Sequence, residues 1–278
     1  MTIKDILVHV DPSPRCAARL DVATILARRF GAHLVGLHVR PFETTPGYAA
    51  VELRDALLKL NRQATEAAAQ AAKTLFDRHM AGTQLSTEWR VTDGYVDDHI
   101  ALNARYCDLT IVGQPDRNTD PSAPDETAID RVILATGRPV LVVPYAGRFE
   151  TIGTRVLVAW DASREATRAI SDALPFLAAA EKVTVLAVNP RDGLRHHGDV
   201  PAADMALHLA RHGVTVEAAH DVAKDIGVAD VLLSRAADLG VDLIVMGAYG
   251  HARILELALG GVTRSMLEHM TAPVLMSH

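Results

Sequence analysis

The stretch KDILVHVD at residues 4–11 and the stretch TRVLVAWD at residues 154–161 decide the fold. Each is a short, mostly apolar run that ends in an aspartate, Asp11 in the first and Asp161 in the second. A helical pattern follows each run, and then a second apolar run such as EKVTVLAVN at residues 181–189. Short apolar runs that do not alternate with polar residues are typical of strands covered on both faces of a parallel sheet.

The two halves agree again near their ends, which indicates an internal repeat. CDLTIVGQ at residues 107–114 matches VDLIVMGA at 241–248, and RPVLVVP at 138–144 matches APVLMSH at 272–278. The same elements in the same order predict two copies of one unit joined head to tail. We place the two domains at residues 1–147 and 153–278, because Gly147 and Gly153 flank a short polar stretch between the copies.

Within each copy, strand-like runs alternate with helical patterns. In the second copy we predict five strands, at Arg155–Trp160, Val183–Val188, Val214–His220, Asp242–Met246 and Val274–Met276. The predicted helices between them lie at Glu165–Ala180, Ala202–Arg211, Ile226–Leu239 and Gly261–His269. The first copy also contains a long helix-rich run at Val51–Met80. This alternation predicts two tandem α/β domains, each with a doubly wound, five-stranded parallel sheet.

The composition of the 278-residue chain is that of a globular protein, with 49% hydrophobic and 22% charged residues. Its formal net charge of -6 gives no general attraction to phosphate backbones, so we expect no nucleic-acid partner. No apolar run is long enough to cross a bilayer and no leader pattern precedes the first strand, so we expect a cytoplasmic protein without membrane contact. Cys16 and Cys107 are too few for a disulfide framework or a structural zinc site.

Glycines and an aspartate follow two strands of the second copy, at the edge where doubly wound sheets bind ligands. Asp161 comes directly after the first strand, and Gly247-Ala-Tyr-Gly250 comes after the fourth. After nine intervening residues, Gly260-Gly261-Val262-Thr263 leads into a predicted helix. Glycines let the backbone pass close to a ligand, and the free amides of a helix start attract anions. The pattern predicts a nucleotide site with an acid at its sugar or base end.

A purely structural interpretation of the same residues is also open. A glycine after a parallel strand can simply make the turn, and Asp161 or Ser163 can cap the next helix. The first strand is followed by neither G-x-x-x-x-G-K-[ST] nor G-x-G-x-x-G. Their absence excludes a P-loop NTPase and a dinucleotide-binding Rossmann enzyme.

These residues resemble the universal stress protein family. Its ATP-binding members carry G-x2-G-x9-G-[ST]-V-[ST], and here Gly247, Gly250 and Gly260 match the glycines and Val262-Thr263 the closing pair. The resemblance covers both halves and implies a tandem member, with two Rossmann-like, adenine nucleotide alpha hydrolase-like domains packed as a pseudo-dimer. It implies that the fifth strands, at Pro139–Pro144 and Pro273–Ser277, pair within the chain and close two sheet edges. A homodimer of such chains is compatible with it.

The resemblance also implies a ligand, ATP or else ADP or AMP, with Mg²⁺ as a compatible companion. Asp161 would hydrogen-bond the adenosine, Val188 would meet the adenine through its backbone, and Gly247 and Gly250 would line the ribose and phosphate path. The phosphates would be held, mostly by backbone N–H groups, at Gly260, Gly261, Val262 and Thr263. Gly261 replaces the family's Ser or Thr, and the lost hydroxyl predicts weaker binding, by roughly ten-fold or more.

The first copy departs much further from the family motif. After Gly113 it has no paired glycines, and the acidic residues Asp116, Asp120, Asp125 and Glu126 would repel phosphates. We therefore predict that this half does not bind ATP in the family manner and that Asp11 is a cap or turn residue. A different small molecule in an acidic, loop-rich pocket is left open.

Two histidines invite a metal hypothesis, because His208 and His212 lie four apart on a predicted helix. No carboxylate or cysteine sits at ligand spacing in that run, so no metal site is predicted. We also find no base or nucleophile near the glycine-rich loop, so any ATP hydrolysis would be slow and no catalytic residue is proposed.

The leading hypothesis is a stress-response sensor or regulator that binds an adenine nucleotide in its second half and acts on protein partners that the sequence does not identify. A nucleotide-independent interaction protein is the alternative, favoured by Gly261 and the degenerate first half. An adenylating enzyme or flavoprotein of the related fold is a third hypothesis. It is disfavoured because the chain lacks an S-G-G-x-D-S loop and an H-x-G-H pair.

Overall fold

The computed structural model describes residues 2–42, 51–114, 126–190, 202–250 and 261–278. The elements of the first half are β1 Asp5–His9, α1 Cys16–Phe30, β2 His33–Arg40, α2 Val51–Met80, β3 Thr87–Asp93, α3 Val96–Ala104, β4 Leu109–Gly113, α4 Glu126–Thr136 and β5 Val140–Val143. Those of the second half are β6 Arg155–Ala159, α5 Arg164–Leu177, β7 Lys182–Val188, α6 Ala203–Arg211, β8 Val216–Asp221, α7 Val228–Asp238, β9 Leu243–Gly247, α9 Val262–His269 and β10 Val274–Ser277.

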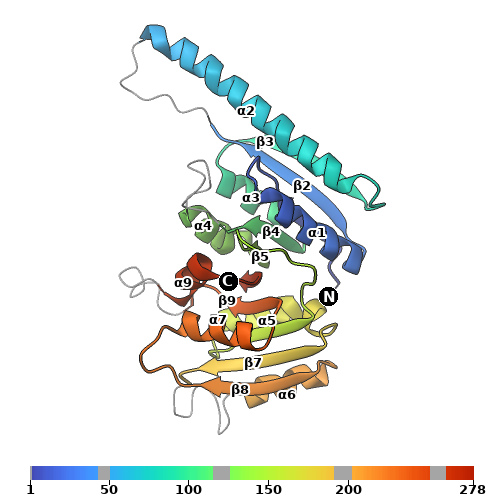
Figure 1. Ribbon diagram of the computed structural model, residues 1–278, viewed down its shortest axis with the longest axis vertical. Coiled ribbons are helices and arrows are strands. Elements are labelled where there is room, and N and C mark those ends of the chain that lie inside the picture. The colour runs from blue at the N-terminus through green and yellow to red at the C-terminus, as the bar shows by residue number, and fades with distance from the viewer. Residues whose placement is uncertain (1, 43–50, 115–125, 191–201, 251–260) are drawn as a thin grey trace.

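All the strands join one ten-stranded sheet in the order β3-β2-β1-β4-β5-β10-β9-β6-β7-β8 (Figure 1). Each half contributes five parallel strands, as the sequence predicts. The halves meet where β5 pairs antiparallel with β10, with Val142 opposite Val274 and Val140 opposite Met276. This contact confirms the expected pairing of the fifth strands within the chain, and it leaves neither strand as a free edge.

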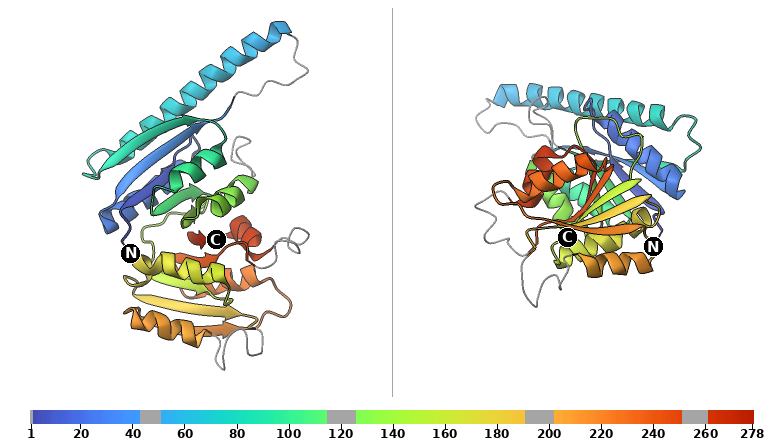
Figure 2. Two further views of the ribbon diagram at one scale, coloured as in Figure 1. Left: turned by 180° about the vertical axis from the view of Figure 1, so that it is seen from behind. Right: turned by 60° about the horizontal axis from the view of Figure 1, so that its bottom comes forward.

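Helices cover both faces of the sheet and give the molecule three layers (Figures 1 and 2). The core on one face contains buried side chains of α1, α2, α5 and α6, and the core on the other contains those of α3, α4, α7 and α9. Neighbouring residues of a strand point to opposite faces, so Ile6 and Val8 join the first core while Leu7 joins the second. Phe30 and Phe176 pack edge to face across the two halves, with 5.1 Å between ring centroids.

Local signals set the helix ends. The α1 helix stops at Gly31, whose φ of 59° is left-handed and whose amide donates to the carbonyls of Ala27 and Arg28. The α5 helix begins after Ser163, whose hydroxyl accepts from the amide of Ala166. The predicted helix at Glu165–Ala180 ends earlier, at Leu177, because the chain tightens there and the amide of Ala180 bonds to the carbonyl of Leu177.

The long helix α2 coincides with the helix-rich run of the sequence. It lies along β2 and β3 and extends beyond them (Figure 2). Among the described residues, no helix combines the length and the apolar composition that a membrane span needs.

The strand order reverses at β1 in the first half and at β6 in the second. On one side of β1 lies β2 and on the other β4, and β6 has β7 and β9 in the same places. A crevice at the carboxyl ends of such strands is the usual ligand position of a doubly wound sheet. The molecule therefore has two equivalent places in which to look for a site.

Candidate functional site

In the second half, Asp161 and Gly247 stand on the two sides of the reversal point, after β6 and at the end of β9. The Asp161 side chain is exposed, and its Oδ1 accepts from the amide of Ser163 at 2.9 Å. Ser163 in turn caps α5. Asp161 therefore stabilises the turn before α5, as the purely structural interpretation expects, and its carboxylate is still exposed to solvent. Val188 ends β7 and is half-buried.

The glycines after β9 have a packing role in the described chain. A Cβ at Gly247 would lie 2.4 Å from the backbone nitrogen of Ala166 and 2.6 Å from the carbonyl carbon of Glu165, so only glycine lets α5 begin this close. A Cβ at Gly250 would lie 3.4 Å from Oε2 of Glu165, a buried carboxylate. The described residues at the end of β9 and directly after it thus lie against the first turn of α5.

The two parts of the glycine-rich motif come together at the start of α9. The amide of Tyr249 donates to the hydroxyl of Thr263 at 3.3 Å, which joins the segment after β9 to the helix. Gly261 stands at the N-cap with φ of -62° and ψ of 171°, and no side chain of the described residues caps the helix there. Val262 begins the helix, and Thr263 is buried. Gly260 lies outside the described residues.

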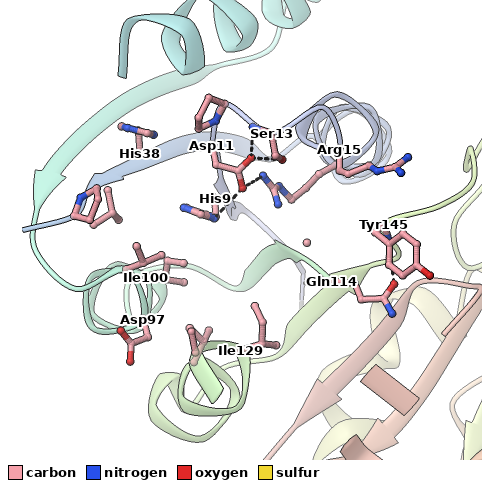
Figure 3. A pocket seen from close by; sticks show the side chains of 18 of the residues that line it. His9, Asp11, Ser13, Arg15, His38, Asp97, Ile100, Gln114, Ile129 and Tyr145 are labelled. Carbon is pink, nitrogen blue, oxygen red and sulfur yellow. Dashed lines mark hydrogen bonds and ion pairs between the residues drawn. The ribbon is translucent and has the colours of Figure 1, made fainter. Parts of the chain in front are cut away.

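In the first half, the equivalent crevice contains a largely buried ion pair, with the Arg19 side chain 5% and the Asp11 side chain 19% exposed (Figure 3). Arg19 of α1 donates to Oδ2 of Asp11 at 2.7 Å, and Oδ1 of Asp11 accepts from the amide and hydroxyl of Ser13. The predicted turn role of Asp11 is confirmed, but the ion pair was not predicted. A Cβ at Gly113 would lie 2.3 Å from Nη1 of Arg19, so this glycine makes room for the guanidinium.

Electrostatics keep this ion pair charged although it is buried. Burial by itself raises the pKa of Asp11, but the charge of Arg19 and the hydrogen bond from Ser13 hold that pKa well below its usual range. Burial lowers the pKa of Arg19 by itself, and the neighbouring Asp11 raises it above its ordinary value. Both oxygens of Asp11 are therefore occupied within the protein, unlike the exposed carboxylate of Asp161.

Two histidines lie beside the ion pair. Burial lowers the pKa of His9 from 6.5 to about 4, against the opposing effect of Asp11, so His9 is neutral at pH 7. His38 is 4% exposed, stacks on Trp89 and has its Nδ1 2.8 Å from the carbonyl oxygen of Val10. The Nε2 of His38 is buried and has no hydrogen-bond partner among the described residues.

These groups line a cavity of about 460 Å³ at the carboxyl ends of β1, β2, β4 and β5. Its remaining walls come from α2, α3 and α4 and are mostly apolar in the described chain (Figure 3). From the sequence, it stayed open whether this half binds a small molecule in an acidic, loop-rich pocket. The described lining is instead mostly apolar and comes largely from strand ends and helices. Asp116, Asp120 and Asp125 lie outside the described residues, and Glu126 begins α4.

Sequence reasoning missed Arg19, His9 and His38 as members of one site. One signal was available, because Arg19 interrupts the apolar face of α1 in CAARLDVATIL. The repeat also shows that the equivalent positions of the second half are Ala169, Ala159 and Val188. A charged residue and two histidines stand where the sister copy has small or apolar residues, so the two crevices differ in their chemistry.

His208 and His212 lie side by side at the end of α6, with 4.7 Å between their ring centroids. In the part of the chain that the structure describes, no group of three or more His, Cys, Asp or Glu side chains is arranged to hold a metal ion. Cys16 and Cys107 are buried free thiols.

Comparison with known proteins relates both halves to one family. The family model described as "Universal stress protein family" matches residues 2–144 and, again, residues 154–278. A curated universal stress protein of Synechocystis is 24% identical over 314 aligned positions, which cover 98% of this chain and 99% of that protein.

Solved structures show the same fold over the whole chain. A universal stress protein from Archaeoglobus fulgidus superposes with a TM-score of 0.70 at 16% identity, covering 99% of this chain and 96% of that one. A putative universal stress protein from Pseudomonas aeruginosa gives a TM-score of 0.58 at 18% identity, covering 99% and 93%. Because the family model matches both halves, this chain belongs to the universal stress protein family and carries the family's domain twice.

Proposed function

We propose that the second half binds an adenine nucleotide, ATP, ADP or AMP, and that the protein works as a nucleotide-dependent sensor in a stress response. The start of α9 is the observation that carries this proposal. Its first amides have no side-chain cap among the described residues, and the Tyr249–Thr263 hydrogen bond places them beside the segment after β9. Uncapped helix amides attract phosphate through their N–H groups and the helix dipole.

The crevice of the second half supports the proposal. Where Arg19 fills the first crevice, the second has Ala169, and the carboxylate of Asp161 remains exposed. We assign the adenosine end to Asp161 and Val188, and the ribose and phosphate path to Gly247 and Gly250. The phosphates are assigned to the backbone at Gly260, Gly261, Val262 and Thr263.

We assign the protein a binding role and no catalytic step, and we place it in the cytoplasm. Buried Glu165, whose Oε1 pairs with Arg164 at 3.2 Å, lies beside Gly250 on the proposed phosphate path, and a carboxylate there disfavours a bare polyphosphate. Mg²⁺ bound to the phosphates would relieve that repulsion, so ATP is expected to bind better with Mg²⁺ than without it. The same carboxylate, together with the missing hydroxyl at Gly261, favours the second candidate function, a stress protein that acts on protein partners without nucleotide.

Titration calorimetry on the full chain tests the proposal, with ATP, ADP and AMP in the presence and absence of Mg²⁺. Gly261→Asp is the decisive variant, because the backbone at Gly261 suits an N-cap and the new carboxylate would occupy the helix amides. We expect this variant to lose at least ten-fold in nucleotide affinity while its melting temperature stays the same or rises. A loss of binding with a gain in stability cannot come from unfolding.

Asp161→Asn serves as the matched variant at the other end of the site. Its amide oxygen can still accept from Ser163, so the turn is kept while the charge is lost. We expect weaker binding with unchanged stability. If wild-type protein gives no heat and no thermal protection at millimolar nucleotide, the nucleotide proposal is wrong and the partner-binding function takes its place.

A further inference from the structure

The cavity of the first half has the size and the walls of a small-molecule site. Its volume of about 460 Å³ lies within the range of known ligand pockets, roughly 300–1,000 Å³. The apolar side chains around it include Val39, Val96, Ile100, Ile129, Val132 and Pro144. Burying an apolar ligand surface against such walls contributes roughly 25 cal/mol for each Å².

The lining of this cavity also includes the histidine His38. The carbonyl oxygen of Val10 can only accept, so the Nδ1 of His38 carries a hydrogen, which leaves Nε2 as the ring's acceptor position. This acceptor is buried and unpartnered among the described residues, and His38 lines the cavity. A buried polar atom without a partner is costly, so a ligand that donates a hydrogen bond to it restores what the folded protein has lost.

The charged side chains of the described lining are already engaged within the protein. Asp11 pairs with Arg19, Asp97 pairs with Arg131, and the guanidinium of Arg15 lies 5.9 Å from the centre of the Tyr145 ring. A nucleotide would have to compete for Asp11, both of whose oxygens are occupied. The described lining thus offers apolar walls and a ring-nitrogen acceptor, which suits an uncharged molecule.

We propose that the first half carries a separate binding site for a neutral, largely apolar small molecule, such as an aromatic alcohol or an indole, whose hydroxyl or N–H group donates to Nε2 of His38. The site does not depend on nucleotide binding in the second half. It uses the same point of the fold for a different class of ligand, because α1 and β2 supply Arg19 and His38 where the second half has Ala169 and Val188.

Two probes of nearly the same shape test the proposal on the full chain. 2-Naphthol has a hydroxyl donor, and 2-methoxynaphthalene has the same rings without a donor. We expect calorimetry or ligand-detected NMR to show that 2-naphthol binds about five- to ten-fold more tightly, as one hydrogen bond to a buried acceptor predicts. In His38→Phe, which keeps a ring against Trp89, that preference should disappear while the affinity for 2-methoxynaphthalene is retained.

A pair of variants on α2 locates the bound probe. Ala68 lines the cavity and is half-buried, so Ala68→Trp should fill the space and abolish binding. Ala71 is exposed on the same helix and is not among the lining residues, so Ala71→Trp should bind 2-naphthol like the wild type. No binding of either probe, binding that survives Ala68→Trp, or displacement of 2-naphthol by ATP would each overturn the proposal. Displacement would assign the cavity to nucleotide.

Discussion

Asp11 and Asp161 stand at the same position in two copies of one domain, yet their carboxylates have different surroundings. Asp11 is paired with Arg19 under the cover of α1, whereas Asp161 is exposed and bonds only its own turn among the described residues. One position in the first helix of each copy explains the difference, because α1 has Arg19 where α5 has Ala169. The fold sets where a ligand can enter, and a few side chains decide which ligand it is.

Glycine has different tasks in the two crevices as well. Gly113 leaves room for the guanidinium of Arg19, whereas Gly247 leaves room for the backbone at the start of α5. The same residue at the same strand end therefore accommodates a side chain in one half and a main chain in the other. Neither observation requires a ligand, so the two glycines alone do not distinguish a binding half from a non-binding half.

Breaking the ion pair should give the largest effect. Arg19→Ala makes the first crevice resemble the second, but it leaves the carboxylate of Asp11 buried without its cation. Removing one partner of a buried pair costs about 3–5 kcal/mol, and we expect that loss in urea unfolding at pH 7. The double variant Arg19→Ala with Asp11→Ala should recover part of it. A loss below about 1 kcal/mol would mean that solvent reaches Asp11 once Arg19 is gone.

Lowering the pH should destabilise the protein through His9 of the first half, whose counterpart in the second half is Ala159. The folded pKa of His9, about 4, is below its unfolded value of 6.5, so as pH falls the unfolded chain takes up a proton that the folded chain does not. Stability is thus lost from about pH 6.5 downwards, by about 2 kcal/mol between pH 7 and pH 5 from this group. Asp11 adds to the loss only at lower pH, below its ordinary pKa of 3.8.

Urea unfolding of wild type and His9→Ala at both pH values measures this contribution. The variant loses side-chain volume and is expected to be less stable at pH 7, so the comparison uses only the change with pH. We expect the wild type to lose about 2 kcal/mol more than the variant. Equal losses would show that His9 is protonated in the folded protein with Asp11, Arg19 and His38 around it.

Alanine at the two strand-end glycines tests their different tasks. Gly247→Ala places a methyl group against backbone that cannot move without shifting α5, and we expect a cost of about 1–3 kcal/mol. Gly113→Ala meets the end of the Arg19 side chain and should cost less. Thermal unfolding of both variants decides the order, and the reverse order would show that the buried ion pair is the more rigid neighbour.

Restoring a hydroxyl at Gly261 should give the smallest effect. Gly261→Ser suits the backbone of that N-cap and should stabilise the protein by a few tenths of a kcal/mol. It should also tighten ATP binding several-fold, because the family's phosphate donor is replaced. Gly261→Ala has the same backbone restriction without the hydroxyl and serves as the control. Equal ATP affinity in the two variants would count against a phosphate contact at this position.

The parts of the structure that follow from local pattern were predictable. Apolar runs predicted the strands, the repeat predicted two similar halves, and the family resemblance predicted that β5 pairs with β10, although not that the two run antiparallel. The chemistry of the first crevice could not be predicted in this way, because Arg19 and Asp11 become partners only once α1 packs beside β4. Likewise, nothing local to His38 shows that one ring nitrogen is bonded to Val10 and that the other is buried without a partner among the described residues.

Gln114 follows β4, lines the first cavity and donates through its amide to the carbonyl oxygen of Leu267, in the last turn of α9, at 2.7 Å. The first turn of α9 is the proposed phosphate contact of the second half. One short helix therefore touches both candidate sites, one at each end. Thermodynamic linkage then sets a condition: whatever factor a ligand in the first cavity imposes on nucleotide affinity, nucleotide imposes the same factor on that ligand. Two titrations, each run with the other site filled, would measure one and the same number.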